Sequence, residues 1–382
     1  MTWVDNAGAT SAPATSTFST GILNAAAWGA AEWISGSGGK LNTFRAELTL
    51  TSPVTRARMF ITGLGYAKTW LNGALTDDHE LGQFTTFQQR TLYDVVDVTS
   101  QLRVGCNALG VMLGAGWWSE PSINAGVRQF RLMLSVTTQD GNTATYYSQN
   151  AAGGSLVFAA TTGPVTADNI YDGESFDGRI AAAIAGWSQC GFAPSPAWPW
   201  QATEAPAVTP SSYGAVISAH GVPIRTDRTY SVVDSGISQP RPNVFVFDFG
   251  QNMAGQTTLK VEDCPNGTVI TLIHNEILNV DGTVNRNLAK MEGQYTCAGS
   301  NGVEEYRSLF TYYGFRYVQV EGWPGEPGEE ALLAHFVHSD VPQSGEFSSS
   351  SQLLNAIQHA TRFASWSNLM DVPTDCPQRE RA

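Results

Sequence analysis

The segment Phe44-Arg45-Ala46-Glu47-Leu48-Thr49-Leu50 alternates apolar and polar side chains, and Arg56-Ala57-Arg58-Met59-Phe60-Ile61-Thr62 does the same. A period of two is typical of a β-strand that turns one face to a core and the other to solvent. Turn-forming pairs such as Asn72-Gly73 and Asp140-Gly141 separate these short segments. The pattern therefore predicts an antiparallel β-sandwich without parallel crossovers.

A proline-rich stretch, Ala193-Pro194-Ser195-Pro196-Ala197-Trp198-Pro199-Trp200, follows this first β region. Proline at this density blocks both helices and central strands, so we expect an extended boundary between domains near residue 205. Alternating or apolar runs resume over 244–255, 268–276 and 310–320, and they predict a second antiparallel β-sandwich.

The pattern changes again after residue 341. Ser350-Ser351-Gln352 can start a helix as its cap, and apolar residues recur near helical spacing from Leu353 through Trp366. The sequence thus predicts four parts: a flexible lead-in over 1–26, jelly-roll-like sandwiches over 27–205 and 206–340, and a helical segment over 341–382.

Composition limits the possible partners. The chain has 382 residues and a formal net charge of -13, and only 14% of its residues are charged. Nucleic acids and anionic membranes favour basic surfaces, so we expect neither as a partner. The 11 tryptophans suit sugar binding, because a flat aromatic face can stack on a pyranose ring.

Five scattered cysteines show no Cys-x-x-Cys spacing, so the sequence indicates neither a zinc site nor a disulfide framework. Cys264 and Cys297 could pair across neighbouring strands, but reduced thiols are the favoured interpretation. We expect no signal peptide at the N-terminus and no membrane span. A cytoplasmic protein and one secreted from a longer precursor both stay open, as does the oligomeric state.

The last stretch, Asp375-Cys376-Pro377-Gln378-Arg379-Glu380-Arg381, gathers charged residues directly after the helical pattern. Pro373 and Pro377 favour extended backbone, so these charges are expected on a loop. Loops on rigid scaffolds often carry catalytic residues. A solvated cluster of arginine and glutamate is the alternative interpretation.

This motif resembles the signature of the bacterial α-L-rhamnosidases, glycoside hydrolase family 78, whose commoner form carries an extra Asp before the Glu. Earlier segments are similar to the same family in the same order: 65–73, 92–99, 107–118, 170–179 and 248–255. The resemblance covers about 27–382 and implies that residues from about 350 form the first helix of an incomplete (α/α)6 barrel.

The resemblance also implies the chemistry. Glu380 would be the general acid of an inverting hydrolase that releases terminal α-L-rhamnose from glycosides or polysaccharides. Asp375 and Arg379 would hold the sugar hydroxyls. The family's general base would lie beyond Ala382, so the chain is expected to be a fragment with little or no turnover. No cofactor is required; calcium binds the N-terminal sandwich of some relatives, but no ligands or metal-binding residues can be assigned here.

Inverting hydrolysis needs two carboxyl groups about 6.5–9.5 Å apart, one protonated and one that activates water. Arg379 and Arg381 would lower the pKa of Glu380, so its role as an acid requires both guanidinium groups to face substrate or other carboxylates. The alternative function is a non-catalytic carbohydrate-binding β-sandwich protein.

Other polar and aromatic residues are interpreted as structural. Tyr66 and Trp70 are expected to pack in the core rather than to form a sugar platform. Six further residues are expected to serve turns, hydrogen bonds between strands or domain contacts rather than catalysis or ligand binding: Glu174, Asp177, Asp248, Asn252, His274 and Glu276.

Overall fold

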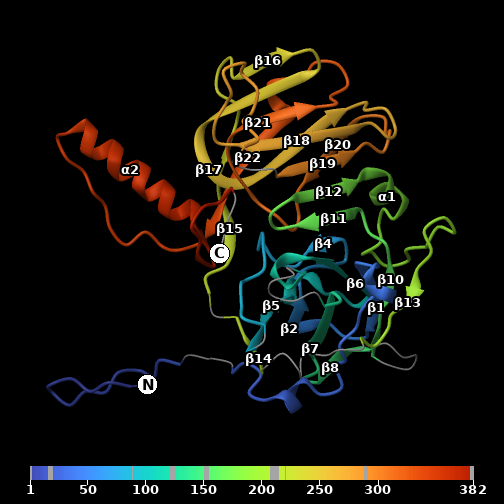
Figure 1. The fold of residues 1–382 in the computed structure, drawn as a ribbon. Helices are drawn as coiled ribbons and strands as arrows, with labels where there is room; N and C mark the ends of the chain where they lie inside the picture. Colours follow the sequence, from blue (N-terminus) through green and yellow to red (C-terminus); the bar gives the residue numbers. More distant parts are fainter. Residues whose placement is uncertain are drawn as a thin grey trace.

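The structure is a computed structural model that describes residues 2–15, 20–87, 89–119, 126–149, 155–206, 215–219, 221–287 and 291–378. It is mainly β, with three large sheets and one two-stranded sheet in the described part of the chain (Figure 1). The predicted β class is therefore confirmed.

Two six-stranded sheets form the N-terminal unit. The first has the order β13-β10-β1-β6-β3-β4 and the second the order β14-β5-β2-β7-β8-β9. The strands of the first sheet are β1 (Thr43–Leu50), β3 (Tyr66–Leu71), β4 (Ala74–Leu75), β6 (Gly105–Gly114), β10 (Ala159–Thr161) and β13 (Gln201–Ala202). Those of the second are β2 (Val54–Leu64), β5 (Arg90–Asp97), β7 (Gln129–Thr138), β8 (Thr143–Gln149), β9 (Leu156–Val157) and β14 (Ala215–Ser218).

These two sheets share one hydrophobic core. Phe44 and Leu48 of β1 are buried while Glu47 between them is exposed, as the alternation predicted. Phe44 packs edge-on against Phe130 of β7, with ring centroids 5.1 Å apart, and so links the two sheets. Burial of such apolar surface, worth about 25 cal/mol per Å², stabilises the unit.

A ten-stranded sheet forms the second unit, and its main path runs β11-β12-β19-β18-β21-β17-β22-β15. Strands β16 and β20 pair with β17 off this path. The bounds are β11 (Val165–Asn169), β12 (Gly173–Asp177), β15 (Ile224–Tyr230), β16 (Ile237–Arg241), β17 (Val244–Glu262), β18 (Val269–Asn275), β19 (Glu292–Thr296), β20 (Val303–Arg307), β21 (Tyr313–Glu321) and β22 (Leu332–Ser339).

A bend in β17 lets this long strand contact several neighbours. Its register against β21 shifts between Asp248 and Met253, where Gly250 has a φ of 72° that glycine adopts readily. Asp248 accepts two hydrogen bonds of 2.8 Å from Arg316 and one of 2.7 Å from the Gly250 N–H. Asp248 therefore supports the bend, as its structural interpretation predicted.

Parallel pairing joins segments that the sequence placed in different domains. Strand β12 precedes the proline-rich stretch, yet it pairs in parallel with β19 of the ten-stranded sheet. Strands β5 and β14, and β8 and β9, are also parallel. The antiparallel pattern thus omitted three parallel pairs, of which β5–β14 and β12–β19 join segments more than a hundred residues apart and leave no local signal. The boundary near residue 205 stays a prediction.

Two α-helices lie in the described chain. Helix α1 (Gly178–Ala183) is capped by Asp177, whose Oδ1 accepts a hydrogen bond of 2.9 Å from the Arg179 N–H. Helix α2 (Gln352–Ser367) is capped by Ser351 and confirms the predicted helix. Short 3-10 helices span Ala25–Trp28, Ser37–Gly39, Thr99–Gln101, Gly116–Ser119 and Glu329–Ala331. None of the described helices is both long and apolar enough to cross a membrane.

The disulfide expectation was wrong. Cys106 pairs with Cys190 and Cys264 with Cys297, which leaves Cys376 as the free cysteine. The Cα atoms of the pairs lie 6.1 and 6.0 Å apart, within the usual range for a disulfide. The sequence had left the pairing of Cys264 with Cys297 open as an alternative, whereas the pairing of Cys106 with Cys190, 84 residues apart, had no signal in the sequence.

The remaining structural interpretations agree with the contacts. Tyr66 is buried, and Trp70 packs against Trp187 with ring centroids 5.3 Å apart. Asn252 donates a hydrogen bond of 2.8 Å from its side-chain amide to Glu276. His274 is only 1% exposed and shares a hydrogen bond of 3.0 Å with Thr257.

The disulfides give a direct chemical prediction. Titration of the unreduced, denatured chain with a thiol reagent should find one thiol, and reduction should raise the number to five. Cys264→Ser with Cys297→Ser should lower the free energy of unfolding by about 2–4 kcal/mol, because the open loop regains entropy in the unfolded state. Five thiols without reduction would contradict the pairing.

Burial of His274 predicts an acid-sensitive fold. Burial lowers the pKa of His274 to about 3, below the ordinary 6.5, so the unfolded chain takes up the proton first as the pH falls. Stability should therefore fall below pH 6.5 by up to about 1.4 kcal/mol per pH unit from this group. His274→Gln should flatten the dependence of the melting temperature on pH, whereas His359→Gln, on the exposed surface of α2, should not.

Candidate functional site

The structure describes the first part of the predicted catalytic motif. Asp375 is exposed, and its Oδ1 accepts a hydrogen bond of 2.9 Å from the Cys376 N–H. Arg379 and Glu380 lie outside the described residues, so their predicted roles stay predictions. The described part of the site is therefore the segment that leads to these two residues.

A tight hairpin precedes the motif. Strands β23 (Leu369–Met370) and β24 (Val372–Pro373) pair in antiparallel around Asp371, whose φ is 69°. Aspartate is among the few non-glycine residues that adopt this left-handed region readily. The Thr374 N–H donates to the Asn368 oxygen at 2.8 Å and closes the loop. The chain thus reverses directly after α2 and leads into Asp375.

Asp371 attaches this hairpin to both β units. Its Oδ2 accepts a hydrogen bond of 2.9 Å from the N–H of Phe84, in the loop between β4 and β5. Its own N–H donates to Ser339 Oγ, at the end of β22, over 2.7 Å. Hydrogen bonds to a charged carboxylate are worth about 1.5–3 kcal/mol each. The motif is therefore fixed from two sides.

The loop that carries Phe84 is itself held to the second unit. Arg307 of β20 donates from Nη2 to Glu80 at 2.7 Å and to Thr226 at 2.8 Å. Its Nε donates to Gln256 Oε1 at 2.9 Å. A guanidinium group that uses several donors at once fixes geometry better than a single ion pair. The Phe84 N–H is consequently presented at a defined position.

The C-terminal turn of α2 is packed on β22. Phe363 stacks on Phe336 at 5.3 Å between ring centroids, and Trp366 stacks on His338 at 5.5 Å. Arg228 lies over the Trp366 ring at 5.9 Å. These contacts set the direction in which the chain leaves the helix.

The motif also lies directly on β21. A Cβ atom on Gly314 would come 2.8 Å from the backbone nitrogen of Gln378, a separation that side chains do not adopt. Gly314 therefore permits the backbone of the motif to approach the sheet. Pro377, next to Gln378, is buried in the same contact region.

Carboxylates lie close to the hairpin. The pKa of Asp94 in β5 is raised to about 6, above all by burial; His79 opposes this rise, and the nearby carboxylates of Asp77 and Asp371 contribute to it. This acidic surrounding disfavours a negatively charged ligand there. An exposed carboxylate such as Asp375 can accept hydrogen bonds from sugar hydroxyls.

The sequence did not reveal that Asp371, Phe84 and Gly314 position the motif. The positions of Asp371 and Gly314 depend on contacts between distant segments, and only the Asp-Val-Pro string hinted at a turn after the helix. Among the described residues, no group of three or more His, Cys, Asp or Glu side chains is arranged to hold a metal ion. The possible calcium site stays a prediction.

The β scaffold thus holds the start of the motif at the base of helix α2, against both β units. Three family models match the chain. The α-L-rhamnosidase N-terminal domain matches residues 52–228, the concanavalin-like domain of bacterial α-L-rhamnosidases matches 238–338, and their six-hairpin glycosidase domain matches 342–382. The chain belongs to the bacterial α-L-rhamnosidase family, glycoside hydrolase family 78.

Known α-L-rhamnosidases are similar to this chain in sequence and in structure. An α-L-rhamnosidase of Streptomyces avermitilis is 32% identical over 370 residues, covering 93% of this chain and 34% of that protein. One of Formosa agariphila is 27% identical and is covered to 41%. The solved structure of α-L-rhamnosidase from Dictyoglumus thermophilum superposes with a TM-score of 0.88 at 32% identity, covering 99% of this chain and 44% of that one. The chain thus spans about a third to two fifths of the curated relatives.

A further solved structure contains a sugar. The Streptomyces avermitilis α-L-rhamnosidase complexed with L-rhamnose has a TM-score of 0.81 at 30% identity and covers 90% of this chain and 33% of that one. At this level of identity the comparison supports the same order of β units and helix in this chain.

The free thiol of Cys376 can test how Asp371 holds the motif, because the other four cysteines are paired. Asp371→Ala should raise the rate at which a thiol reagent modifies Cys376 by about fivefold or more, since the Phe84 N–H loses its acceptor. Asp371→Asn should leave the rate nearly unchanged, because asparagine keeps an oxygen acceptor and tolerates positive φ.

Asp140→Ala is the matched control, since Asp140 is an exposed carboxylate in the turn between β7 and β8, where its Oδ2 accepts a hydrogen bond of 2.8 Å from Asn142. Equal modification rates in all four proteins would show that Asp371 does not fix the motif.

Proposed function

We propose that this chain is the part of an inverting α-L-rhamnosidase that supplies the general acid and positions the sugar. Glu380 gives a proton to the departing oxygen, while Asp375 and Arg379 hold the rhamnose hydroxyls. The observation that carries the proposal is the hairpin at Asp371, which fixes the approach to this motif against both β units. Family membership supplies the reaction class.

In this proposal the chemistry follows the inverting pathway. The bond between the anomeric carbon and the leaving oxygen breaks as Glu380 protonates that oxygen, and water attacks from the opposite face after a second carboxylate takes its proton. We assign that second carboxylate to no described residue. Arg379 bound to the sugar would no longer lower the pKa of Glu380 as strongly, which favours the protonated form.

We also propose that the chain contains two β-sandwiches and the start of an (α/α)6 barrel. The shared core of the two six-stranded sheets supports a β-sandwich in the N-terminal unit, and the curved ten-stranded sheet supports a second one. Helix α2 projects from the body (Figure 1) and exposes apolar side chains, with Leu353 69% and Ile357 53% exposed. Such a surface suits the first helix of an (α/α)6 barrel, in which further helices would cover it.

The substrate class follows from the relatives and the charge. We propose terminal α-L-rhamnose of glycosides or polysaccharides, which is neutral and compatible with a net charge of -13. The two disulfides support folding in an oxidising compartment, where such bonds persist. No cofactor enters the proposed reaction.

A chimera tests the proposed roles. The matching segment of the Streptomyces avermitilis relative is replaced by this chain, so that the rest of that enzyme completes the glycosidase domain. We expect release of rhamnose from phenyl α-L-rhamnoside, with the inverted anomer detected by proton NMR. Glu380→Gln in the chimera should lower kcat by about 10²–10⁴-fold, because a poor leaving group depends on the general acid. Asp375→Asn should mainly raise KM.

Glu346→Gln is the matched control, since Glu346 is an exposed carboxylate in the same C-terminal segment. A Glu380→Gln chimera with undiminished kcat on phenyl rhamnoside would remove the acid role from this residue. A retained anomer would contradict the inverting pathway.

A further inference from the structure

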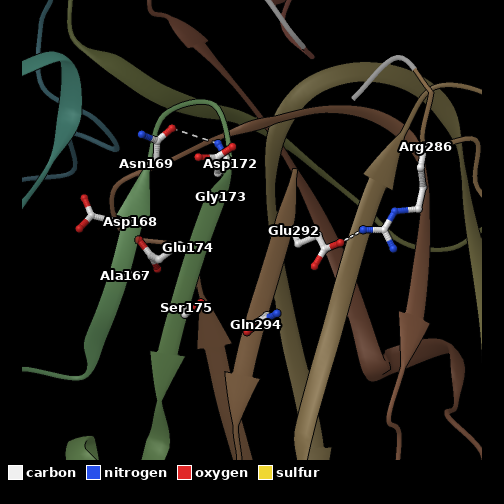
Figure 2. A pocket seen from close by; sticks show the side chains of 10 residues that line it. All are labelled: Ala167, Asp168, Asn169, Asp172, Gly173, Glu174, Ser175, Arg286, Glu292 and Gln294. Atoms are coloured by element: carbon white, nitrogen blue, oxygen red, sulfur yellow. Dashed lines mark hydrogen bonds and ion pairs between the residues drawn. The ribbon is translucent and has the colours of Figure 1, made fainter. Parts of the chain in front are cut away.

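A hollow lies over β11, β12 and β19, on the ten-stranded sheet (Figure 2). Its volume is about 580 Å³, within the range of about 300–1,000 Å³ usual for ligand sites. Its lining includes the parallel pair of β12 and β19. Neither the motif nor α2 contributes to it.

Small residues on adjacent strands form its floor. Ala167 of β11 lies beside Ser175 of β12, and Gly173 of β12 lies beside Glu292 of β19. A Cβ on Gly173 would come 2.0 Å from the Glu292 carbonyl oxygen, and the φ of Gly173 is 112°, so the backbone requires glycine there. The close pairing of β12 and β19 thus requires a residue without a side chain at Gly173, which leaves space in the hollow.

Polar side chains surround this floor. Gln294 follows Glu292 on the same face of β19 and lies beside Ser175. Arg286 forms an ion pair with Glu292 on one side of the hollow, and exposed Asp172 lies at the turn on the other side (Figure 2). The lining therefore offers amide, hydroxyl, carboxylate and guanidinium groups together, both as donors and as acceptors.

Two other acidic residues of the lining already have partners within the protein. Asp168 Oδ1 pairs with Arg128 Nη1 at 2.9 Å, and Glu174 Oε2 accepts from the Phe310 N–H at 2.8 Å. The ion pair of Arg286 and Glu292 cancels its own charge. The charge left facing the hollow is small and negative, at Asp172, which disfavours anionic ligands.

We propose that this hollow binds a neutral sugar unit of a glycan, at a second site separate from the motif around Asp375. Mixed donors and acceptors around a shallow floor match a polyol, whose hydroxyls both donate and accept. No aromatic side chain is among the described residues that line the hollow, so hydrogen bonds supply the recognition and millimolar affinity is expected. The inference goes beyond the proposed function, because it uses none of the catalytic residues.

L-rhamnose titrated into the intact chain tests the site, with saturation-transfer NMR and calorimetry as readouts. Gln294→Ala should weaken binding about three- to tenfold, because one side chain's hydrogen bonds are lost. Ser175→Leu should fill the floor and abolish binding. Gln251→Ala, which removes a half-buried amide on β17 outside the hollow, is the matched control and should bind as the unchanged chain does. Melting temperatures show whether each variant folds.

The outcomes separate this site from the motif. Asp375→Asn should leave binding unchanged. Lack of L-rhamnose binding by the intact chain, or unchanged binding by folded Gln294→Ala, would overturn the proposal. Loss of binding in Asp375→Asn alone would place the sugar at the motif, which overturns this second site while it supports the proposed function.

Discussion

Glu174 is a buried carboxylate that ties β12, which precedes the proline-rich stretch, to the strands of the same sheet that follow it. It lies on β12 and accepts hydrogen bonds from the N–H groups of Leu309 and Phe310 at 3.0 and 2.8 Å and from the Tyr306 hydroxyl at 3.3 Å. Burial raises the pKa of Glu174 to about 8, while these donors act in the opposite direction. Without the carboxylate the buried donors would lose their acceptor, at a cost of about 1–3 kcal/mol each.

The parallel pair of β12 and β19 lies beside this carboxylate within the ten-stranded sheet, and the loop with Glu80 and Phe84 connects the N-terminal unit to that sheet. Asp371 then joins the motif hairpin to that loop and to Ser339. Each contact restricts the movement of the segment that makes the next contact. The β units therefore act as a rigid support for a charged loop, and the proposed chemistry depends on that rigidity, because small misplacements of catalytic groups lower rates strongly.

Local patterns in the sequence predicted the local structure well. The alternation at 44–50 and the cap at Ser351 predicted strand β1 and helix α2, because each signal lies within one element. The disulfides, the parallel strand pairs and the role of Asp371 were not predicted. Each of them depends on which distant segments meet, and spacing along the chain does not carry that information.

The candidate site shows the same limit. The composition of the segment around Asp375 predicted an exposed loop, and Asp375 is exposed. The hollow over Gly173 and Gln294 joins residues more than a hundred positions apart, and each of them looks ordinary in its own strand. Only the fold brings these residues to one face of the ten-stranded sheet.

The positions of the disulfides also bear on how the chain is made. Cys106 and its partner Cys190 leave the ribosome before Cys264 is synthesised, and Cys297 follows before Cys376. Since domains generally fold in the order of their synthesis, each pair can close within its own β unit before the next cysteine emerges. Cys376 follows both pairs along the chain, so the four other cysteines can already be bonded to one another when it emerges. The order of these five cysteines along the chain thus limits scrambled cross-links among them during synthesis.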